Sequence, residues 1–299
     1  MNYKKIPYLV FSLFLIFQTC EPAKPPVSFS PIQGFSEEVN NQLRSFFEDT
    51  KNHPDRKIAV FDGDGTVLGQ APHYLADECL YEVAKQKPEK KPEVIKKMVK
   101  LSNVSMDYVQ LRVHFFEGDS LEYLRELGRT CYHKYYKGKV FSSMVSLIDN
   151  LKKHNFEVWI VTASPEAMYQ KFLSEELHIP ITHIIGVKSV IREGKITSEM
   201  VQPIPQDNGK MEAIETFVQG KPLLVGGNSR GDKEMIEYSA KLKLIVNPDE
   251  HVAADQKESI ASYAKKSGWL IVKQRDVPSA DFPNISKTEY NIRVNKTNE

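Results

Sequence analysis

Hydrophobic and polar residues follow two different patterns along the chain. Residues 74–137 carry apolar positions at helical spacing, in segments such as YLADECLYEVAKQ and SLEYLRELGRTCYHKYY, and no strand-like alternation interrupts them. After residue 139, short apolar runs alternate with amphipathic helical segments. This alternation predicts an α/β fold, a doubly wound domain with a mostly parallel sheet. The helical block is then an insertion after the first strand.

The individual elements follow from the same pattern. Strands are expected at residues 57–61, 156–162, 184–187, 223–225, 242–246 and 268–272, with a hairpin over 190–196. Helices are expected at residues 36–49, 141–154, 165–177, 210–218 and 233–240.

The strongest chemical signal directly follows the first strand, where the chain reads Asp62-Gly63-Asp64-Gly65-Thr66. Ligands of α/β sheets bind outside the carboxyl ends of the strands, so we expect both aspartates to face a site. Two aspartates separated by one residue can divide the chemistry, one attacking and the other exchanging protons. An ordinary Asp-Gly turn is the alternative.

Three later segments place polar residues at the ends of other elements. Thr162 ends a strand in VTAS, Lys210 opens a helix in DNGK, and GNSRGD at residues 227–232 follows the strand LLVG. With the aspartate segment, these four segments in this order resemble the four motifs of the haloacid dehalogenase superfamily. The resemblance covers residues 57–250, and the helical block resembles the cap of its phosphoserine-phosphatase-like branch.

The resemblance implies hydrolysis of a phosphomonoester through an aspartyl-phosphate. Asp62 would be the nucleophile, and Asp64 would protonate the leaving alcohol and then deprotonate water. Thr162 and Lys210 would hold the phosphoryl oxygens. Because dehalogenases of this superfamily have no acid or base at the second aspartate, Asp64 favours phosphoryl transfer.

Mg²⁺ is the cofactor that the resemblance implies. Its ligands would be the Asp62 side chain, the main-chain oxygen of Asp64, and Asn228 and Asp232 of the fourth segment. Asn228 departs from the family, which usually has aspartate there. An amide oxygen can coordinate Mg²⁺ but brings no charge, so Asp232 is expected to contribute more.

The expected substrate is a small soluble phosphoester, because a cap that closes over the site excludes large groups together with water. Arg112 of the cap is a candidate substrate contact, although a structural charge is the alternative. Two other functions stay open: a phosphotransferase of the same family, and a catalytically weak surface lipoprotein that binds ligands or partners. The balance of 40 basic and 39 acidic side chains gives no support to nucleic-acid binding.

The N-terminus has the features of an export signal. Lys4 and Lys5 precede an apolar run at residues 6–17, and Cys20 follows it. The stretch resembles a bacterial lipoprotein signal, which implies acylation of Cys20 and a membrane anchor facing the periplasm or the cell surface. Simple secretion is the alternative.

The domain organisation follows from these observations. We expect a signal at 1–20, a proline-rich tether at 21–35, an α/β core at 36–73 and 138–275, a helical cap at 74–137 and a polar tail at 276–299. With Cys20 acylated, two cysteines remain, and both Cys79 and Cys131 fall in the cap. A disulfide between the first and last cap helices and a pair of buried thiols are both open.

Overall fold

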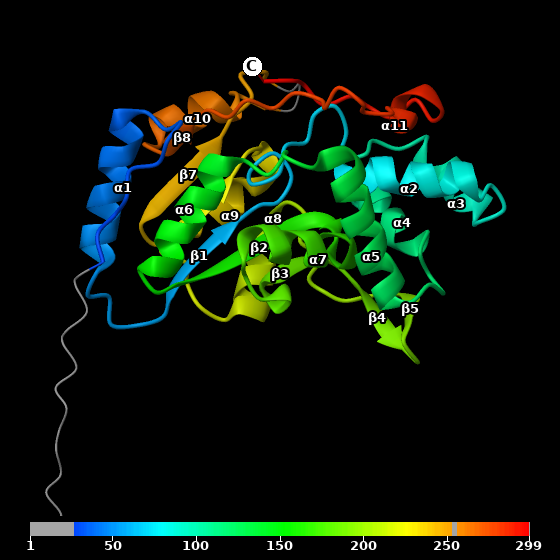
Figure 1. Cartoon of the computed structure of the whole chain (residues 1–299), viewed down its shortest axis with the longest axis horizontal. Helices are drawn as coiled ribbons and strands as arrows, with labels where there is room; N and C mark the ends of the chain where they lie inside the picture. The colour runs from blue at the N-terminus through cyan, green and yellow to red at the C-terminus, as the bar shows by residue number, and fades with distance from the viewer. Residues whose placement is uncertain (1–26, 253–255, 299) are drawn as a thin grey trace, which may run out of the picture.

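A six-stranded parallel sheet forms the centre of the fold (Figure 1). The structure is a computed structural model that describes residues 27–252 and 256–298, so the predicted signal segment and Cys20 lie outside the described residues. The strand order is β3-β2-β1-β6-β7-β8. The strands are β1 (Lys57–Phe61), β2 (Phe156–Pro165), β3 (Ile184–Val187), β6 (Leu224–Gly227), β7 (Leu242–Val246) and β8 (Leu270–Val272). The predicted α/β class is confirmed.

Helices cover both faces of the sheet, which is why its strands are mostly apolar. Side chains of β1 alternate between two cores, with Ile58 and Val60 in one and Ala59 and Phe61 in the other. One core is completed by α1 (Glu37–Thr50), α6 (Ser142–Lys153) and α7 (Glu166–Leu177). The other is completed by α8 (Asn208–Ala213), its continuation Ile214–Val218, α9 (Lys233–Glu237) and α10 (Ile260–Lys266).

The insertion between β1 and β2 folds as a helical subdomain beside the sheet (Figure 1). It contains α2 (Leu75–Gln86), α3 (Pro92–Met98), α4 (Met106–His114), α5 (Leu121–Cys131) and the turn Tyr132–Tyr136. Ser105 and Ser120 begin α4 and α5, because each hydroxyl accepts a hydrogen bond from the amide three residues later. Gly128 lets α5 approach α7 closely, since a side chain there would overlap the Met168 carbonyl.

A hairpin of β4 (Ser189–Arg192) and β5 (Lys195–Met200) turns at Glu193 and Gly194, as the sequence pattern predicts. It extends from the end of β3 toward the helical subdomain, where Gly118 donates a hydrogen bond to the Ile196 carbonyl. No helix within the described residues is long and apolar enough to cross a membrane.

Two segments that the sequence predicts as a tether and a tail pack against the body where they are described. Phe29 of the tether is buried and stacks on Phe47 of α1, with ring centroids 5.3 Å apart. In the segment predicted as a polar tail, α11 (Ile285–Thr288) packs on α2, and Tyr290 stacks on Tyr81 at 4.5 Å. Isolated apolar residues in a mostly polar sequence make these contacts, so the sequence pattern does not predict that the two segments pack.

A disulfide joins Cys79 of α2 to Cys131 of α5, with the Cα atoms 6.0 Å apart. Of the two states that the sequence leaves open, the structure contains the bridge. Both cysteines are buried, and the bond ties the first long helix of the subdomain to the last.

Reducing this disulfide should lower the free energy of unfolding by at most about 4 kcal/mol, because the bridge closes a large loop in the unfolded chain. The two cysteines are 52 residues apart. Urea unfolding with and without reductant measures the effect. A Cys79→Ala/Cys131→Ala variant is the control and should not respond to reductant. Free thiols at both positions in the non-reduced protein would contradict the prediction.

Candidate active site

The residues singled out in the sequence gather at one edge of the sheet. Asp62 directly follows β1, Thr162 lies near the end of β2, and Asn228 directly follows β6. Because β1 lies between β2 and β6, the three loops meet at the carboxyl ends of the strands. The Asp62 amide donates to the Gly226 carbonyl at 2.9 Å, which fixes the start of the first loop against β6.

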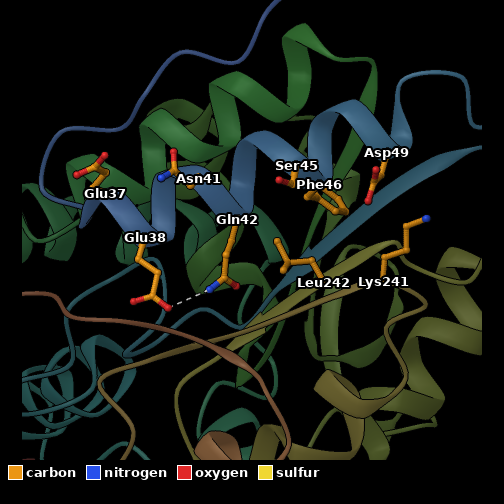
Figure 2. A pocket seen from close by; sticks show the side chains of 9 residues that line it. All are labelled: Glu37, Glu38, Asn41, Gln42, Ser45, Phe46, Asp49, Lys241 and Leu242. Carbon is orange, nitrogen blue, oxygen red and sulfur yellow. Dashed lines mark hydrogen bonds between the residues drawn. The ribbon is translucent and has the colours of Figure 1, made fainter.

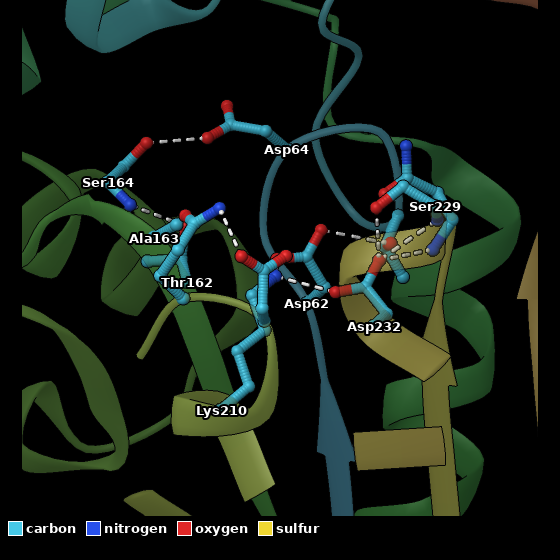
Figure 3. A network of polar contacts seen from close by, with 12 residues as sticks. Asp62, Asp64, Thr162, Ala163, Ser164, Lys210, Ser229 and Asp232 are labelled. Carbon is cyan, nitrogen blue, oxygen red and sulfur yellow. Dashed lines mark hydrogen bonds and ion pairs between the residues drawn. The ribbon is translucent and has the colours of Figure 1, made fainter. Parts of the chain in front are cut away.

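A lysine placed between two carboxylates forms the centre of this site. Lys210 Nζ donates to Asp62 Oδ1 and to Asp232 Oδ1, each at 2.6 Å (Figure 3). All three side chains are at most 8% exposed. An unpaired charge at this depth is strongly unfavourable, so each carboxylate depends on Lys210.

The pKa values of the two carboxyl groups are shifted in opposite directions. Burial, together with the charge of Asp232, raises the pKa of Asp62 to about 7, although Lys210 opposes the shift. Burial also acts to raise the pKa of Asp232, but Lys210 and two backbone N–H groups outweigh it and the pKa is lowered. Burial acts to lower the pKa of Lys210, and the two carboxylates raise it instead.

Asp232 is fully occupied by donors of this chain. Its Oδ2 accepts from the Asn228 amide at 3.0 Å, the Ser229 amide at 3.0 Å and the Ser229 hydroxyl at 3.1 Å. With Oδ1 bound to Lys210, both oxygens have partners. These contacts let Asp232 fix Lys210 and the loop after β6, and its role as a metal ligand stays a prediction.

Asp64 lies in a different environment, held by hydroxyl groups. Its Oδ2 accepts from Ser164 Oγ at 2.8 Å, and its Oδ1 accepts from Tyr169 OH at 2.7 Å. The carboxylate points toward Ser164 in Figure 3. Burial raises the pKa of Asp64, and these two hydrogen bonds offset the rise only in part. The sequence did not indicate Tyr169, whose position in the first turn of α7 suits a structural role equally well.

Thr162 lies against the loop that carries the aspartates. A side chain at Gly63 would meet Thr162 at 3.2 Å, so the aspartate loop and β2 lie in close contact at this point. Thr162 Oγ1 accepts from the Ser164 amide at 3.2 Å. The hydroxyl is therefore oriented within the last residues of β2.

The helical subdomain contacts the end of β2 through Arg112, which also belongs to a buried ion pair within the subdomain. Arg112 Nη1 lies 3.3 Å from Asp77 Oδ1, and the two side chains are 4% and 0% exposed. Arg112 Nη2 donates to the Ala163 carbonyl at 2.9 Å, between Thr162 and Ser164. Of the two roles considered for Arg112, the structural charge is the one these contacts describe.

The oxygen donors of the first and third loops suit a hard divalent cation. No three His, Cys, Asp or Glu side chains converge as a metal cluster in the part of the chain that the structure describes. The Asn228 amide lies directly against Gly65, so the loop after β6 faces the aspartate loop. The Asp62 carboxylate, the Asp64 carbonyl and the Asn228 amide oxygen are the kinds of ligand that Mg²⁺ takes, with water in its other positions.

A second concave region lies away from this site, along α1 (Figure 2). It is lined by Glu37, Glu38, Asn41, Gln42, Ser45, Phe46, Asp49, Lys241 and Leu242. None of the predicted site residues is among them, so this groove does not compete with the loop cluster as an active site.

Residues 59–237 match the family of haloacid dehalogenase-like hydrolases. The match spans more than half of the chain and all of the loops described above. The chain belongs to this family.

Solved structures show the same fold as this haloacid dehalogenase-like hydrolase. A conserved protein of unknown function from Anaerococcus prevotii is 14% identical, with 89% of this chain and 98% of that one covered and a TM-score of 0.62. A protein of unknown function from Bordetella pertussis is 14% identical, with 73% and 98% covered and a TM-score of 0.57. At this identity the likeness shows the fold alone. No curated protein matches this hydrolase.

Replacing Lys210 by methionine should lower the free energy of unfolding by about 3–5 kcal/mol, since it leaves two buried carboxylates without a partner. Urea unfolding measures the change. The double variant Lys210→Met/Asp62→Asn should recover part of the loss because one uncompensated charge is removed. Lys153→Met, an exposed lysine of α6, is the control and should change little. Unchanged stability in Lys210→Met would contradict the buried ion pair.

Proposed function

We propose that this hydrolase cleaves phosphomonoesters of small soluble alcohols through a phosphorylated Asp62. The observation that supports this most is the pair of buried carboxylates two residues apart in different surroundings. Asp62 is bound to Lys210, and Asp64 is bound to the hydroxyls of Ser164 and Tyr169. Two carboxyl groups in unlike environments can take the unlike roles of nucleophile and acid.

The first step transfers the phosphoryl group to the enzyme. Asp62 Oδ2, whose protein partner is Thr66 Oγ1 at 3.3 Å, attacks phosphorus. The Asp62–phosphorus bond forms, the bond from phosphorus to the alcohol oxygen breaks, and protonated Asp64 gives its proton to that oxygen. Asp64 then removes a proton from water, which attacks the phosphorus. Phosphate leaves, the Asp62 carboxylate is restored and Asp64 is protonated again.

Cationic and hydroxyl donors would hold the phosphoryl oxygens during both steps. Lys210 lies beside Asp62 and carries a compact charge. Thr162 lies next to Gly63, the residue that follows Asp62. Mg²⁺, held by Asp62, the Asp64 carbonyl and Asn228, would supply the positive charge that lets a carboxylate approach a dianionic phosphoester.

The packing around the site favours a small substrate. Asp62 and Asp64 are 4% and 8% exposed, and Arg112 connects the helical subdomain to the end of β2. A substrate must therefore fit beneath the helical subdomain, which limits the size of its leaving group.

We further propose that the chain is exported and anchored at the membrane through an acylated Cys20. The disulfide between Cys79 and Cys131 is consistent with export, because such bonds persist in oxidising compartments. The partner would then be a phosphorylated metabolite outside the cytoplasm.

Purified protein should release phosphate from some members of a panel of small phosphomonoesters, and only with a divalent cation. Asp62→Asn should abolish turnover and the covalent phosphoenzyme, because an amide is a poor nucleophile. The readouts are phosphate release with and without Mg²⁺ and mass spectrometry of the trapped enzyme. Absence of turnover across a broad panel would contradict the proposal and favour a binding protein, whereas phosphorylation of an added alcohol would indicate a phosphotransferase.

Asp64→Asn should slow hydrolysis of alkyl phosphates more than hydrolysis of p-nitrophenyl phosphate. An alkoxide needs a proton as it leaves, whereas p-nitrophenolate is stable as an anion. The ratio of kcat/KM between the two substrates measures the effect, with Asp107→Asn, a surface aspartate in the first turn of α4, as the control. An equal loss on both substrates would count against Asp64 as the acid.

A further inference from the structure

The C-terminal segment, residues 276–298, crosses both connections between the sheet domain and the helical subdomain. The outgoing connection follows the aspartate loop at residues 67–74, and the returning one lies at residues 137–141. The two run side by side, because Gly69 N donates to the Lys139 carbonyl at 2.8 Å and Phe141 N donates to the Val67 carbonyl at 2.9 Å. Any movement of the subdomain relative to the sheet must bend these two connecting segments.

A buried ion pair attaches the C-terminal segment at this crossing. Lys139 Nζ lies 2.7 Å from Asp276 Oδ1, and the side chains are 8% and 3% exposed. Asp276 Oδ2 accepts from the amides of Gln70 at 2.8 Å and Ala71 at 3.1 Å. Lys139 Nζ also donates to the Ala71 carbonyl at 2.6 Å. One carboxylate therefore binds both connections at once, and a side chain at Gly69 would overlap it.

The far end of the segment continues this hold on the outgoing connection. Asn295 donates through its amide N–H to the Pro72 carbonyl at 2.7 Å and through Nδ2 to the Gln70 carbonyl at 2.9 Å. Asp276 and Asn298 exchange two main-chain hydrogen bonds, of 2.6 and 2.9 Å, so the beginning and end of the segment are paired. The segment thus forms a closed loop whose two ends both contact the connection.

The middle of the segment binds the end of the outgoing connection and the first helix of the subdomain. The ring nitrogens of buried His73 contact Asn284 Oδ1 at 2.7 Å and the Arg293 carbonyl at 3.1 Å. The Glu78 carboxylate of α2 accepts from the amides of Ile285 at 2.6 Å and Ser286 at 3.0 Å. The connections and the subdomain are thus both bound to one segment, which follows β8 of the sheet domain in the chain.

The same connection supports the catalytic loop. Gly65 N donates to the Leu68 carbonyl at 2.6 Å, and the amides of Val67 and Leu68 donate to the Gly63 carbonyl at 3.0 Å. Asp64 is therefore only a few residues of hydrogen-bonded chain away from the amides that Asp276 holds. The segment lies beyond residue 237, where the family match ends.

We propose that residues 276–298 act as a strap that keeps the helical subdomain closed over the site, and that Asp276 is the positioning residue through which the strap fixes the connection and the Asp64 loop. The closure of the subdomain stands on the contacts above. The effect on turnover rests on the proposed phosphatase function.

Hydrogen exchange of the full chain tests the strap directly. In Asp276→Asn, the amides of residues 67–73 and 137–141 should exchange at least about tenfold faster, because the charged acceptor of Gln70 and Ala71 is lost. Amides of β1 and β6 should keep their protection if the loosening is local. Asp281→Asn removes the same charge at an exposed position of the same segment and should behave like the unaltered chain. Unchanged exchange in Asp276→Asn, or an equal increase in Asp281→Asn, would overturn the strap.

Kinetics of the same variants test the positioning role. Asp276→Asn should lower kcat/KM on the best phosphoester about tenfold. Adding Lys139→Met removes the uncompensated buried charge, so it should restore the urea midpoint without restoring either kcat/KM or slow exchange. Recovery of kcat/KM together with stability would show a merely structural role and overturn the positioning claim, as would unchanged kcat/KM in Asp276→Asn. If the unaltered chain hydrolyses no phosphoester, the proposed function fails, while the exchange experiment still decides on the strap.

Discussion

The contact of Lys210 with two buried aspartates is the interaction on which the site depends. The lysine comes from α8, Asp62 follows β1 and Asp232 lies just before α9. Each group alone would be too costly to bury, so the three segments must meet for any of them to be stable in place. A parallel sheet with β1 in its interior provides that meeting point, because loops from neighbouring strands emerge at the same edge. The stability of the fold and the chemistry of the site are thus linked through one ammonium group.

The neutral residue at position 228 changes the balance of charge around this contact. Asp62 and Asp232 together carry one negative charge more than Lys210 neutralises, and Asn228 adds none. Asp232 is already bound by backbone and hydroxyl donors, so its charge is largely directed at Lys210 and the β6 loop. The attraction for the proposed Mg²⁺ at the aspartate loop would therefore rest mainly on Asp62, so weak metal binding is expected.

Local sequence was enough to predict the sheet and most of the site residues. β1 occupies residues 57–61 as its apolar run indicates, and Asp62, Thr162 and Lys210 stand beside strands or helix ends whose signals are local. Tyr169 could not be predicted, because its contact with Asp64 depends on how α7 packs. Asp276 and Lys139 lie 137 residues apart, and no local pattern tells a buried charge from a solvated one. The contacts of Asp232 with Lys210 and the loop after β6 could not be predicted for the same reason, because they depend on how distant segments pack.

The ties of the helical subdomain act at different places, and together they define which motion remains. The disulfide between α2 and α5 is internal to the subdomain, so it makes these helices move as one body without restraining their position over the sheet. Arg112 does restrain that position through its hydrogen bond to the Ala163 carbonyl, and so does the packing of α5 against α7. The C-terminal segment acts at the crossing of the two connections, where a small rotation would displace the whole subdomain. Opening of the subdomain would therefore have to loosen the α5–α7 packing and bend the chain at this crossing, and the resistance to that bending comes partly from residues remote in sequence from Asp62 and Asp64.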